Sequence, residues 1–171
     1  AAAFTPDSRR LVTASRDHTA IVWNVTAGGV MSAEEGDSEG VLVSLRPAGG
    51  RVLTRARGTG ELRFVDTVTG MAAGSLKLPA CENAEARFDP SGSVLLVRPW
   101  DQNRLFLFDA ADGRPRIELG GEGALVTKTA LSLDGAWVAA LHADLTLRVW
   151  ATRTGRLQAE FKTRDENICT I

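Results

Sequence analysis

The sequence predicts an all-β protein built from four consecutive repeats of about 42 residues, and three sets of regularly spaced residues predict it. In the first set, an apolar residue precedes a turn rich in Pro, Asp or Gly, with spacings of 41, 43 and 43 residues, at Phe4, Leu45, Phe88 and Leu131. The second set is Trp23, Val65, Phe108 and Trp150. The third set is a glycine five residues further on, at Gly28, Gly70, Gly113 and Gly155. Because all three sets keep the same phase through four cycles, we interpret the period as a repeated structural unit.

Within each repeat, the residues predict four short strands separated by turns. Apolar runs and runs of alternating polarity recur between the turns, as at 41–45, 93–97, 104–108, 146–150 and 156–161. Alternation with a period of two, and turn residues every 8–12 positions, are typical of strands, and no segment shows a helical stripe. Four strands in such a repeat are the content of one β-propeller blade. We therefore expect one domain over 1–171 with blades at 1–40, 41–83, 84–125 and 126–171.

A four-stranded sheet buries its apolar face only if a neighbouring sheet stacks on it. We expect the aromatic residues of the second set, Trp23, Phe108 and Trp150, to fill the layers between sheets. Val65 occupies the same position in the second repeat and is smaller, so we expect Phe64 to supply the missing volume.

The first repeat resembles the WD-repeat (WD40) β-propeller family, and the resemblance extends through the chain, most strongly in the first and fourth repeats. It implies a structural hydrogen-bond set in which Ser15, Asp17 and Trp23 join a histidine. In the fourth repeat Asp144 precedes Trp150 by six residues, as Asp17 precedes Trp23, and His142 replaces the serine. The family's histidine is missing from the three places where it would be seen, which hold Glu34, Lys77 and Gly120. The turn aspartate is missing from the second and third repeats, which have Thr59 and Gln102 at the matching positions. The structural residues expected from the repeat are Ser15, Asp17, Trp23, Phe108, Asp144 and Trp150.

Four blades lie at the lower end of the usual range for propellers. The last residues, 168–171, look like the beginning of another first strand. We therefore expect the chain to be part of a larger propeller, with further blades or domains of the same protein as neighbours.

Composition and charge exclude several classes of protein. The chain is 44% hydrophobic and 24% charged, which is not the composition of a disordered chain. Its net charge of −1 gives no overall attraction to nucleic acid or to an anionic membrane, and its apolar runs are too short to span a bilayer. Cys81 and Cys169 fit neither a disulfide framework nor a zinc motif. We expect two free thiols and a cytoplasmic location.

No catalytic, metal-binding or cofactor-binding pattern is found. His18 and His142 are the only histidines and occupy turn positions that the repeat explains. The segment 120–129 resembles a phosphate-binding loop only superficially, because the glycine before the lysine is missing and the period places a strand at 126–131. The acidic residues 34–39 are expected in a connection between blades. We therefore expect no enzyme activity and no cofactor.

In the family, turns between second and third strands and loops between blades form the usual binding face. The residues that we expect there are Arg16, His18, Arg55, Arg57, Trp100, Arg104 and His142. An exposed Trp flanked by Arg is typical of an interface hot spot. Trp100 either has this role or folds back over the blade, and the sequence leaves both open.

The sequence therefore predicts a non-catalytic protein–protein interaction or scaffolding module, such as the regulatory or sensing propeller of a larger signalling protein. Its partners would be proteins, and neither nucleic acid nor membrane. Two alternatives are a propeller hydrolase or lyase that uses carboxylates at the central channel, and a sensor of a small ligand or ion.

Overall fold

A computed structural model describes residues 2–5, 7–14, 19–25, 29–35, 38–45, 50–56, 61–69, 71–76 and 84–163. All regular structure in these ranges is strand, arranged in four antiparallel sheets of four consecutive strands. The described ranges thus contain no helix that could cross a membrane. The chain divides into two compact units, Ala1–Glu82 and Asn83–Ile171, and each holds two sheets.

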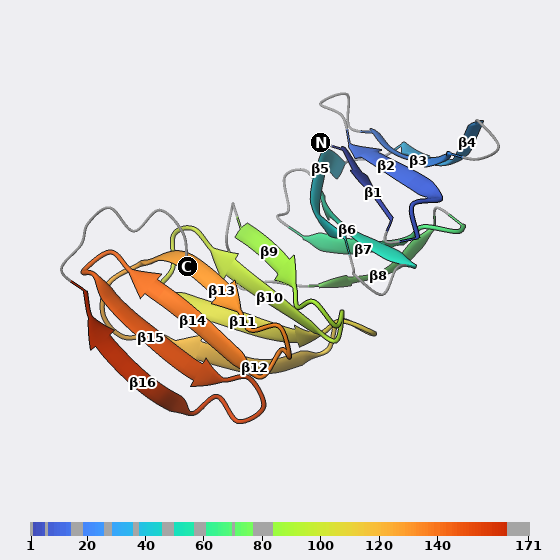
Figure 1. Ribbon diagram of the computed structural model, residues 1–171. Helices are drawn as coiled ribbons and strands as arrows, with labels where there is room; N and C mark the ends of the chain where they lie inside the picture. The colour runs from blue at the N-terminus through green and yellow to red at the C-terminus, as the bar shows by residue number, and fades with distance from the viewer. Residues whose placement is uncertain are drawn as a thin grey trace. The chain divides into compact units, whose positions relative to one another are not determined.

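The first unit contains the sheets β1–β4 and β5–β8 (Figure 1). The strands of the first sheet are β1 (Ala2–Phe4), β2 (Arg10–Ala14), β3 (Thr19–Asn24) and β4 (Gly29–Glu35). Those of the second are β5 (Ser38–Leu45), β6 (Arg51–Ala56), β7 (Leu62–Asp66) and β8 (Ala72–Leu76).

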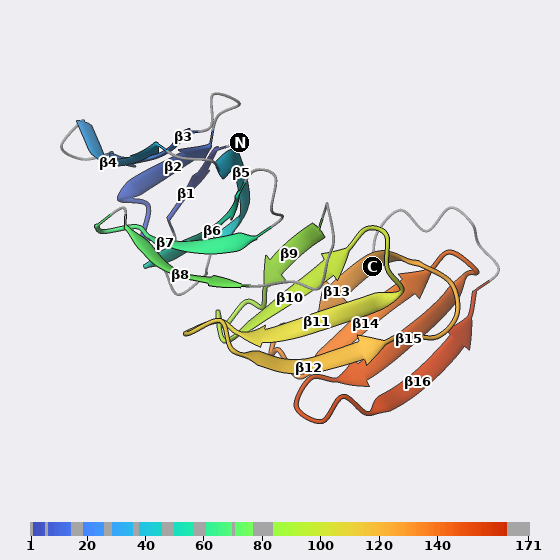
Figure 2. The ribbon, with the colours of Figure 1, turned by 180° about the vertical axis from the view of Figure 1, so that it is seen from behind.

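The second unit contains the sheets β9–β12 and β13–β16, which lie one over the other in both ribbon views (Figures 1 and 2). The strands of its first sheet are β9 (Ala84–Phe88), β10 (Val94–Pro99), β11 (Arg104–Asp109) and β12 (Pro115–Gly120). Those of the other are β13 (Val126–Leu131), β14 (Trp137–His142), β15 (Thr146–Ala151) and β16 (Leu157–Lys162).

The predicted all-β architecture of four-stranded antiparallel sheets is confirmed, including the strand at 126–131 that argued against a phosphate-binding loop. The expectation for the acidic residues 34–39 is wrong. The acidic segment 34–39 is not wholly a connection, because β4 extends to Glu35 and β5 begins at Ser38. Runs of acidic residues carry little strand signal, and pairing with β3 and β6 decides these positions.

Aspartate side chains close the turns that follow the first strand of three repeats. Asp134 accepts hydrogen bonds from Ser132 Oγ (2.6 Å) and from the amide of Ala136 (3.0 Å). Asp7 accepts one from Thr5 Oγ1 in the same way. An Asp, Ser or Thr at these turn positions satisfies backbone groups that the sheet cannot. The Pro-Asp-Gly signal in the sequence therefore has a direct structural cause.

The corresponding turn of the third repeat is the most buried of the three. Asp89 is fully buried and accepts hydrogen bonds from the amides of Ser93 and Val94, both at 2.7 Å, and from Ser91 Oγ. Burial alone would raise the pKa of Asp89, but the hydrogen bonds from Ser91, Val94 and Ser93 outweigh it and hold the pKa below its usual value. Asp89 is therefore an ionised, fully bonded part of the turn.

In the second unit, the two sheets share one apolar layer. Trp150 is 5% exposed and packs in this layer, as predicted for the second set of residues. The β13–β16 sheet also contributes Val126, Val138 and Ala140, while the β9–β12 sheet contributes Val94, Leu96, Leu105, Leu107 and Leu119. Burial of apolar area contributes about 25 cal/mol per Å², so this layer is a large part of the unit's stability.

In the first unit, a smaller layer joins the sheets, made of Val12 and Val22 on one side and Val52 and Val65 on the other. The expectation that Phe64 supplies volume beside Val65 is wrong. Successive side chains of a strand point to opposite faces, so Phe64, although buried, lies on the other face of the sheet. There the Arg51 guanidinium lies 5.9 Å from its ring centroid. Among the described residues, four valines form the layer instead.

The sheets stack in the same direction in both layers. In each, the later sheet contributes its residue of the second set, Val65 or Trp150, and the earlier sheet contributes alternate positions such as Val22 or Leu107. By strand alternation, Trp23 and Phe108 therefore face away from the layer of their own unit. Phe108 is buried, and Trp23 is half-buried.

Replacing Trp150 by alanine is expected to lower the free energy of unfolding by about 3–5 kcal/mol, because it leaves a cavity in the shared layer. Trp100→Ala is the matched control: its side chain is 56% exposed, and its loss is expected to change stability by less than about 0.5 kcal/mol. Urea unfolding of the three proteins measures the difference. Equal losses in both variants would contradict the assignment of Trp150 to the core.

Candidate partner-binding site

Trp100 lies in the turn between β10 and β11 and is 56% exposed. Of the two arrangements left open by the sequence, the structure has the exposed one. Trp is enriched at interface hot spots, and its rigid, amphipathic side chain buries much area on binding at a low entropic cost. An exposed Trp on a turn is therefore the first candidate for a contact with a partner.

The turn that carries Trp100 is fixed to the connection between β12 and β13. Asn103 Nδ2 donates a hydrogen bond to the carbonyl of Gly123 (3.2 Å), and the amide of Gly121 donates one to the carbonyl of Asn103 (3.1 Å). Gly120, at φ +82°, allows this approach, because a Cβ there would lie 2.6 Å from the Asn103 carbonyl oxygen. The site is therefore preorganised, which lowers the cost of binding.

A partly buried ion pair supports the base of the same turn. Arg98, whose side chain is 14% exposed, binds Glu85 Oε2 through Nη2 (2.8 Å) and Nε (3.1 Å). Its Nη1 donates to the carbonyl of Val126 (3.1 Å), so one side chain joins β10, β9 and β13. Burial alone would raise the pKa of Glu85, but the hydrogen bond from Arg98 and the charge of Arg87 hold it below its usual value. Glu85 is therefore a stable anion.

Arg104 begins β11 at the other end of the Trp100 turn and is half-exposed. Its Nη1 lies 2.5 Å from Glu118 Oε1 on the adjacent β12. An exposed pair of this kind contributes little to stability, so Arg104 stays available for exchange with a partner's carboxylate.

His142, expected at the binding face, is buried, with 1% of its surface exposed. Its Nδ1 lies 2.8 Å from the carbonyl oxygen of Ala124, which only accepts, so Nδ1 carries the proton. Nε2 lies 3.5 Å from Arg148 Nη1, and the ring centroid is 6.3 Å from that of Trp150. The prediction of a partner contact through His142 is wrong, because strand pairing turns this side chain into the layer between the sheets.

The structure describes two members of the structural hydrogen-bond set that the family resemblance implies, Trp23 and Asp144. Trp23 Nε1 donates to Oγ1 of Thr13 on the neighbouring strand (2.8 Å). Asp144 is exposed and accepts from the amide of Thr146 (3.1 Å), with Lys162 Nζ at 3.5 Å. It therefore closes the turn between β14 and β15. Sequence spacing places the aspartate in the turn but does not show which groups it binds.

Several expected site residues lie outside the described part of the chain. These are Arg16, His18 and Arg57 of the binding face and Ser15 and Asp17 of the structural set, together with Cys81 and Cys169. Arg55 lies on β6, but its side chain is also not described. Of the expected binding residues, the structure therefore places Trp100 and Arg104 together, at the two ends of one turn.

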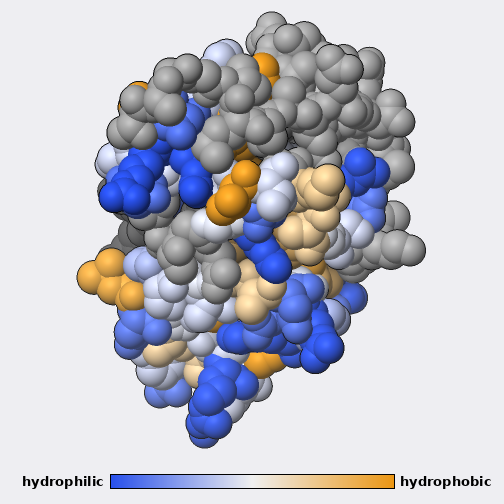
Figure 3. Space-filling view, turned by 90° about the vertical axis from the view of Figure 1, so that its right-hand side faces the viewer, coloured by the Kyte–Doolittle hydropathy of each residue, from blue (hydrophilic) through white to orange (hydrophobic). Residues whose placement is uncertain are grey.

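Two further observations describe the surface. Exposed apolar side chains form separate patches among hydrophilic ones on the face shown in Figure 3. Within the described ranges, no group of three or more His, Cys, Asp or Glu is placed to hold a metal ion.

Sequence reasoning did not identify Arg98, Glu85 and Asn103, which hold the Trp100 turn in place. A weak signal was present, because Arg98 interrupts the otherwise apolar β10. A charged residue in an apolar strand needs a buried partner, but the partner's position depends on the register of β9 and β10.

Comparison with known proteins supports the resemblance in the first repeat. The family described as "WD domain, G-beta repeat" matches residues 1–24, which include β1, β2 and β3. Repeats of this family generally mediate protein–protein interactions. No curated protein matches the chain.

Glu85→Gln is expected to destabilise the protein at neutral pH by roughly 1.5–3 kcal/mol, because it removes the charged partner of a largely buried guanidinium. Since the folded pKa of Glu85 is lowered, the contribution of the pair is fully present above the ordinary value of 4.5 and is lost as the pH falls through the folded pKa. Urea unfolding of both proteins between pH 7 and pH 3 should show their stability difference shrinking below about pH 4.5. A difference that stays constant with pH would contradict this role.

Proposed function

We propose that this chain is a non-catalytic protein–protein interaction module whose sheets are consecutive blades of a larger propeller. The observation that carries the proposal is Trp100, an exposed tryptophan on a turn held in place by the adjacent connection. Arg104 at the end of the same turn adds an exchangeable charge. Together they provide an aromatic anchor and a polar rim, the arrangement found in protein interfaces.

The larger propeller is proposed from the direction in which the sheets stack. Val65 and Trp150 each pack on a preceding sheet, and Trp23 occupies the equivalent position in the first repeat. Half-buried Trp23 and Ile21, which lie on the same face of β3, fit a further blade stacked on that side. A regulatory or sensing propeller within a larger signalling protein would have this arrangement.

The state of Glu85, on the first strand of the third repeat, also suits a binding role better than catalysis. Glu85 is the acidic residue of β9, and two arginines keep it ionised. A general acid at neutral pH needs a raised pKa, whereas that of Glu85 is lowered. The cytoplasmic location remains part of the proposal and rests on the two cysteines, which fit no disulfide pattern.

The test is the effect of Trp100→Ala on partner binding. Proteins captured by the purified chain from a lysate of its own source cells are quantified by mass spectrometry, and a captured partner is then purified and titrated. The dissociation constant is expected to rise by roughly 30-fold, since truncation of a hot-spot residue costs about 2 kcal/mol or more.

Phe161→Ala is the matched control, because Phe161 is an aromatic residue with 55% exposure on β16, in a different sheet from the Trp100 turn. It is expected to leave binding unchanged. The proposal fails if both variants bind the partner as the original chain does, or if Trp100→Ala weakens binding only by lowering the melting temperature.

A further inference from the structure

Hydrogen bonds join three loops of the second unit into one surface at the strand end that carries Trp100. The loops are the β10–β11 turn (100–103), the β12–β13 connection (121–125) and the β14–β15 turn (143–145). Asn103 Nδ2 of the first loop donates to the carbonyl of Gly123 in the connection (3.2 Å). The amide of Ala143 in the third loop donates to the carbonyl of Leu125 in the same connection (2.8 Å). We call these three loops the Trp100 platform.

Side chains of β14 and β15 hold the connection in the middle of the platform. His142 Nδ1 lies 2.8 Å from the carbonyl oxygen of Ala124. Arg148 Nη1 donates to the carbonyl of Glu122 (3.3 Å). The connection is therefore bonded to both sheets of the unit, and its backbone is fixed before a partner arrives. A surface that is ordered in advance loses little conformational entropy on binding.

The platform leaves two large apolar side chains in water, since Trp100 is 56% exposed and Leu125 is 46% exposed. The strand ends that carry them are adjacent. Arg98, two residues before Trp100, donates through Nη1 to the carbonyl of Val126 (3.1 Å), the residue after Leu125. A partner that covers these side chains removes apolar area from water, which is favourable.

The loops of the platform are acidic. They contain Asp101, Glu122 and Asp144 but neither Lys nor Arg. Asp144 is paired with Lys162, whose Nζ lies 3.5 Å from its Oδ2. Asp101 and Glu122 are exposed, and no residue in the described part of the chain forms an ion pair with either of them. The platform therefore has two carboxylates whose only neutralising neighbour is solvent among the described groups.

The cations that flank the platform are already paired. Two further cations, Arg87 on β9 and Lys128 on β13, lie within the strands, and each of them also has a partner. The flanking pairs are Arg98 with Glu85, Arg104 with Glu118 and Arg148 with Glu160. The unpaired charges of the platform itself are therefore negative.

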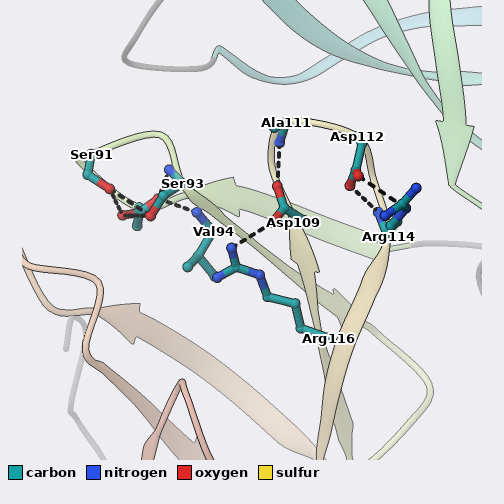
Figure 4. Close-up of polar contacts among 9 residues, drawn as sticks. Ser91, Ser93, Val94, Asp109, Ala111, Asp112, Arg114 and Arg116 are labelled. Atoms are coloured by element: carbon teal, nitrogen blue, oxygen red, sulfur yellow. Dashed lines mark hydrogen bonds and ion pairs between the residues drawn. The ribbon is translucent and has the colours of Figure 1, made fainter.

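The opposite end of the β11–β12 hairpin has a contrasting arrangement. It also carries two aspartates, but an arginine of the same hairpin pairs with each. Arg116 Nη2 lies 2.7 Å from Asp109 Oδ2, and Arg114 Nε lies 3.2 Å from Asp112 Oδ2 (Figure 4). Those carboxylates thus serve the hairpin itself, whereas the carboxylates of Asp101 and Glu122 are left for a partner.

We propose that the Trp100 platform binds a basic segment of the partner protein, an inference that rests on the proposed function of the Trp100 turn. A Lys or Arg of the segment binds Asp101 or Glu122, and arginine does so through two parallel hydrogen bonds. The methylene groups of the same side chain, or a neighbouring apolar residue, cover Trp100 and Leu125 while the charged group stays in water. The face of the Trp100 indole also attracts a cation.

The probe is a phage-displayed library of random peptides, selected on the purified full chain. Enriched peptides are expected to combine Lys or Arg with an aromatic or aliphatic residue. A recovered peptide is synthesised with a fluorescent label, and its dissociation constant is measured by anisotropy for the chain and its variants. This constant is expected to rise when the NaCl concentration is raised from about 0.05 to 0.5 M, because salt screens exposed charges.

Asp101→Asn and Glu122→Gln remove one charge each and keep the size of the side chain. Each is expected to raise the dissociation constant by about fivefold, the effect of losing one exposed ion pair. Asp112→Asn is the matched control, because it removes an exposed carboxylate at the opposite end of the strands and is expected to leave binding unchanged. Thermal unfolding checks that all variants fold.

Trp100→Ala separates this inference from the proposed function. If it weakens a recovered peptide that is acidic or uncharged, the interaction role of Trp100 stands and the basic segment is wrong. The same conclusion follows if Asp101→Asn and Glu122→Gln have no effect, or no more effect than Asp112→Asn. Peptides that bind Trp100→Ala as tightly as the original chain, or a selection that enriches none, would overturn both.

Discussion

The apolar layer between successive sheets is the interaction on which the rest of the structure depends. A four-stranded sheet has two faces and cannot bury either alone, so each repeat needs a neighbour. In the second unit this layer contains Trp150 from one sheet and Leu105 and Leu107 from the other, and in the first unit its described residues include Val22 and Val65. In both units the later sheet contributes the same position of the repeat to the layer, Val65 or Trp150. The repeats therefore stack in one direction.

The layer leaves the strand ends free to carry function. At one end, Asn103 and Arg98 fix the turn of Trp100 to neighbouring strands. At the other end, Thr152 joins two turns of one sheet, and Gly135 brings one of them against Asp89 of the adjacent sheet. The β10–β11 turn thus presents an exposed tryptophan, Trp100, on backbone that is already ordered. A scaffold of this kind loses little conformational entropy on binding, which is the physical reason that stacked sheets make good interaction platforms.

Much of the fold could be predicted from the sequence, because strand alternation and turn chemistry are local. The strands at 104–108 and 146–150 and the Asp-containing turns follow from residues only a few positions apart. The site was less predictable, because it depends on register and on contacts between sheets. His142 is a residue type that is common in binding sites, but its pairing with Val126 places its side chain in the layer between the sheets. The sequence left open whether Trp100 is exposed or packed, and the structure shows it exposed.

Nuclear Overhauser effects between the two sheets of a unit test the stacking most directly. With selectively methyl-labelled protein, the Trp150 indole protons should show effects to the methyl groups of Leu105, Leu107 or Leu119, and the methyl groups of Val65 should show them to those of Val22. Effects confined to residues of the same sheet would mean that the sheets do not pack face to face, and the account of the Trp100 site would then be wrong.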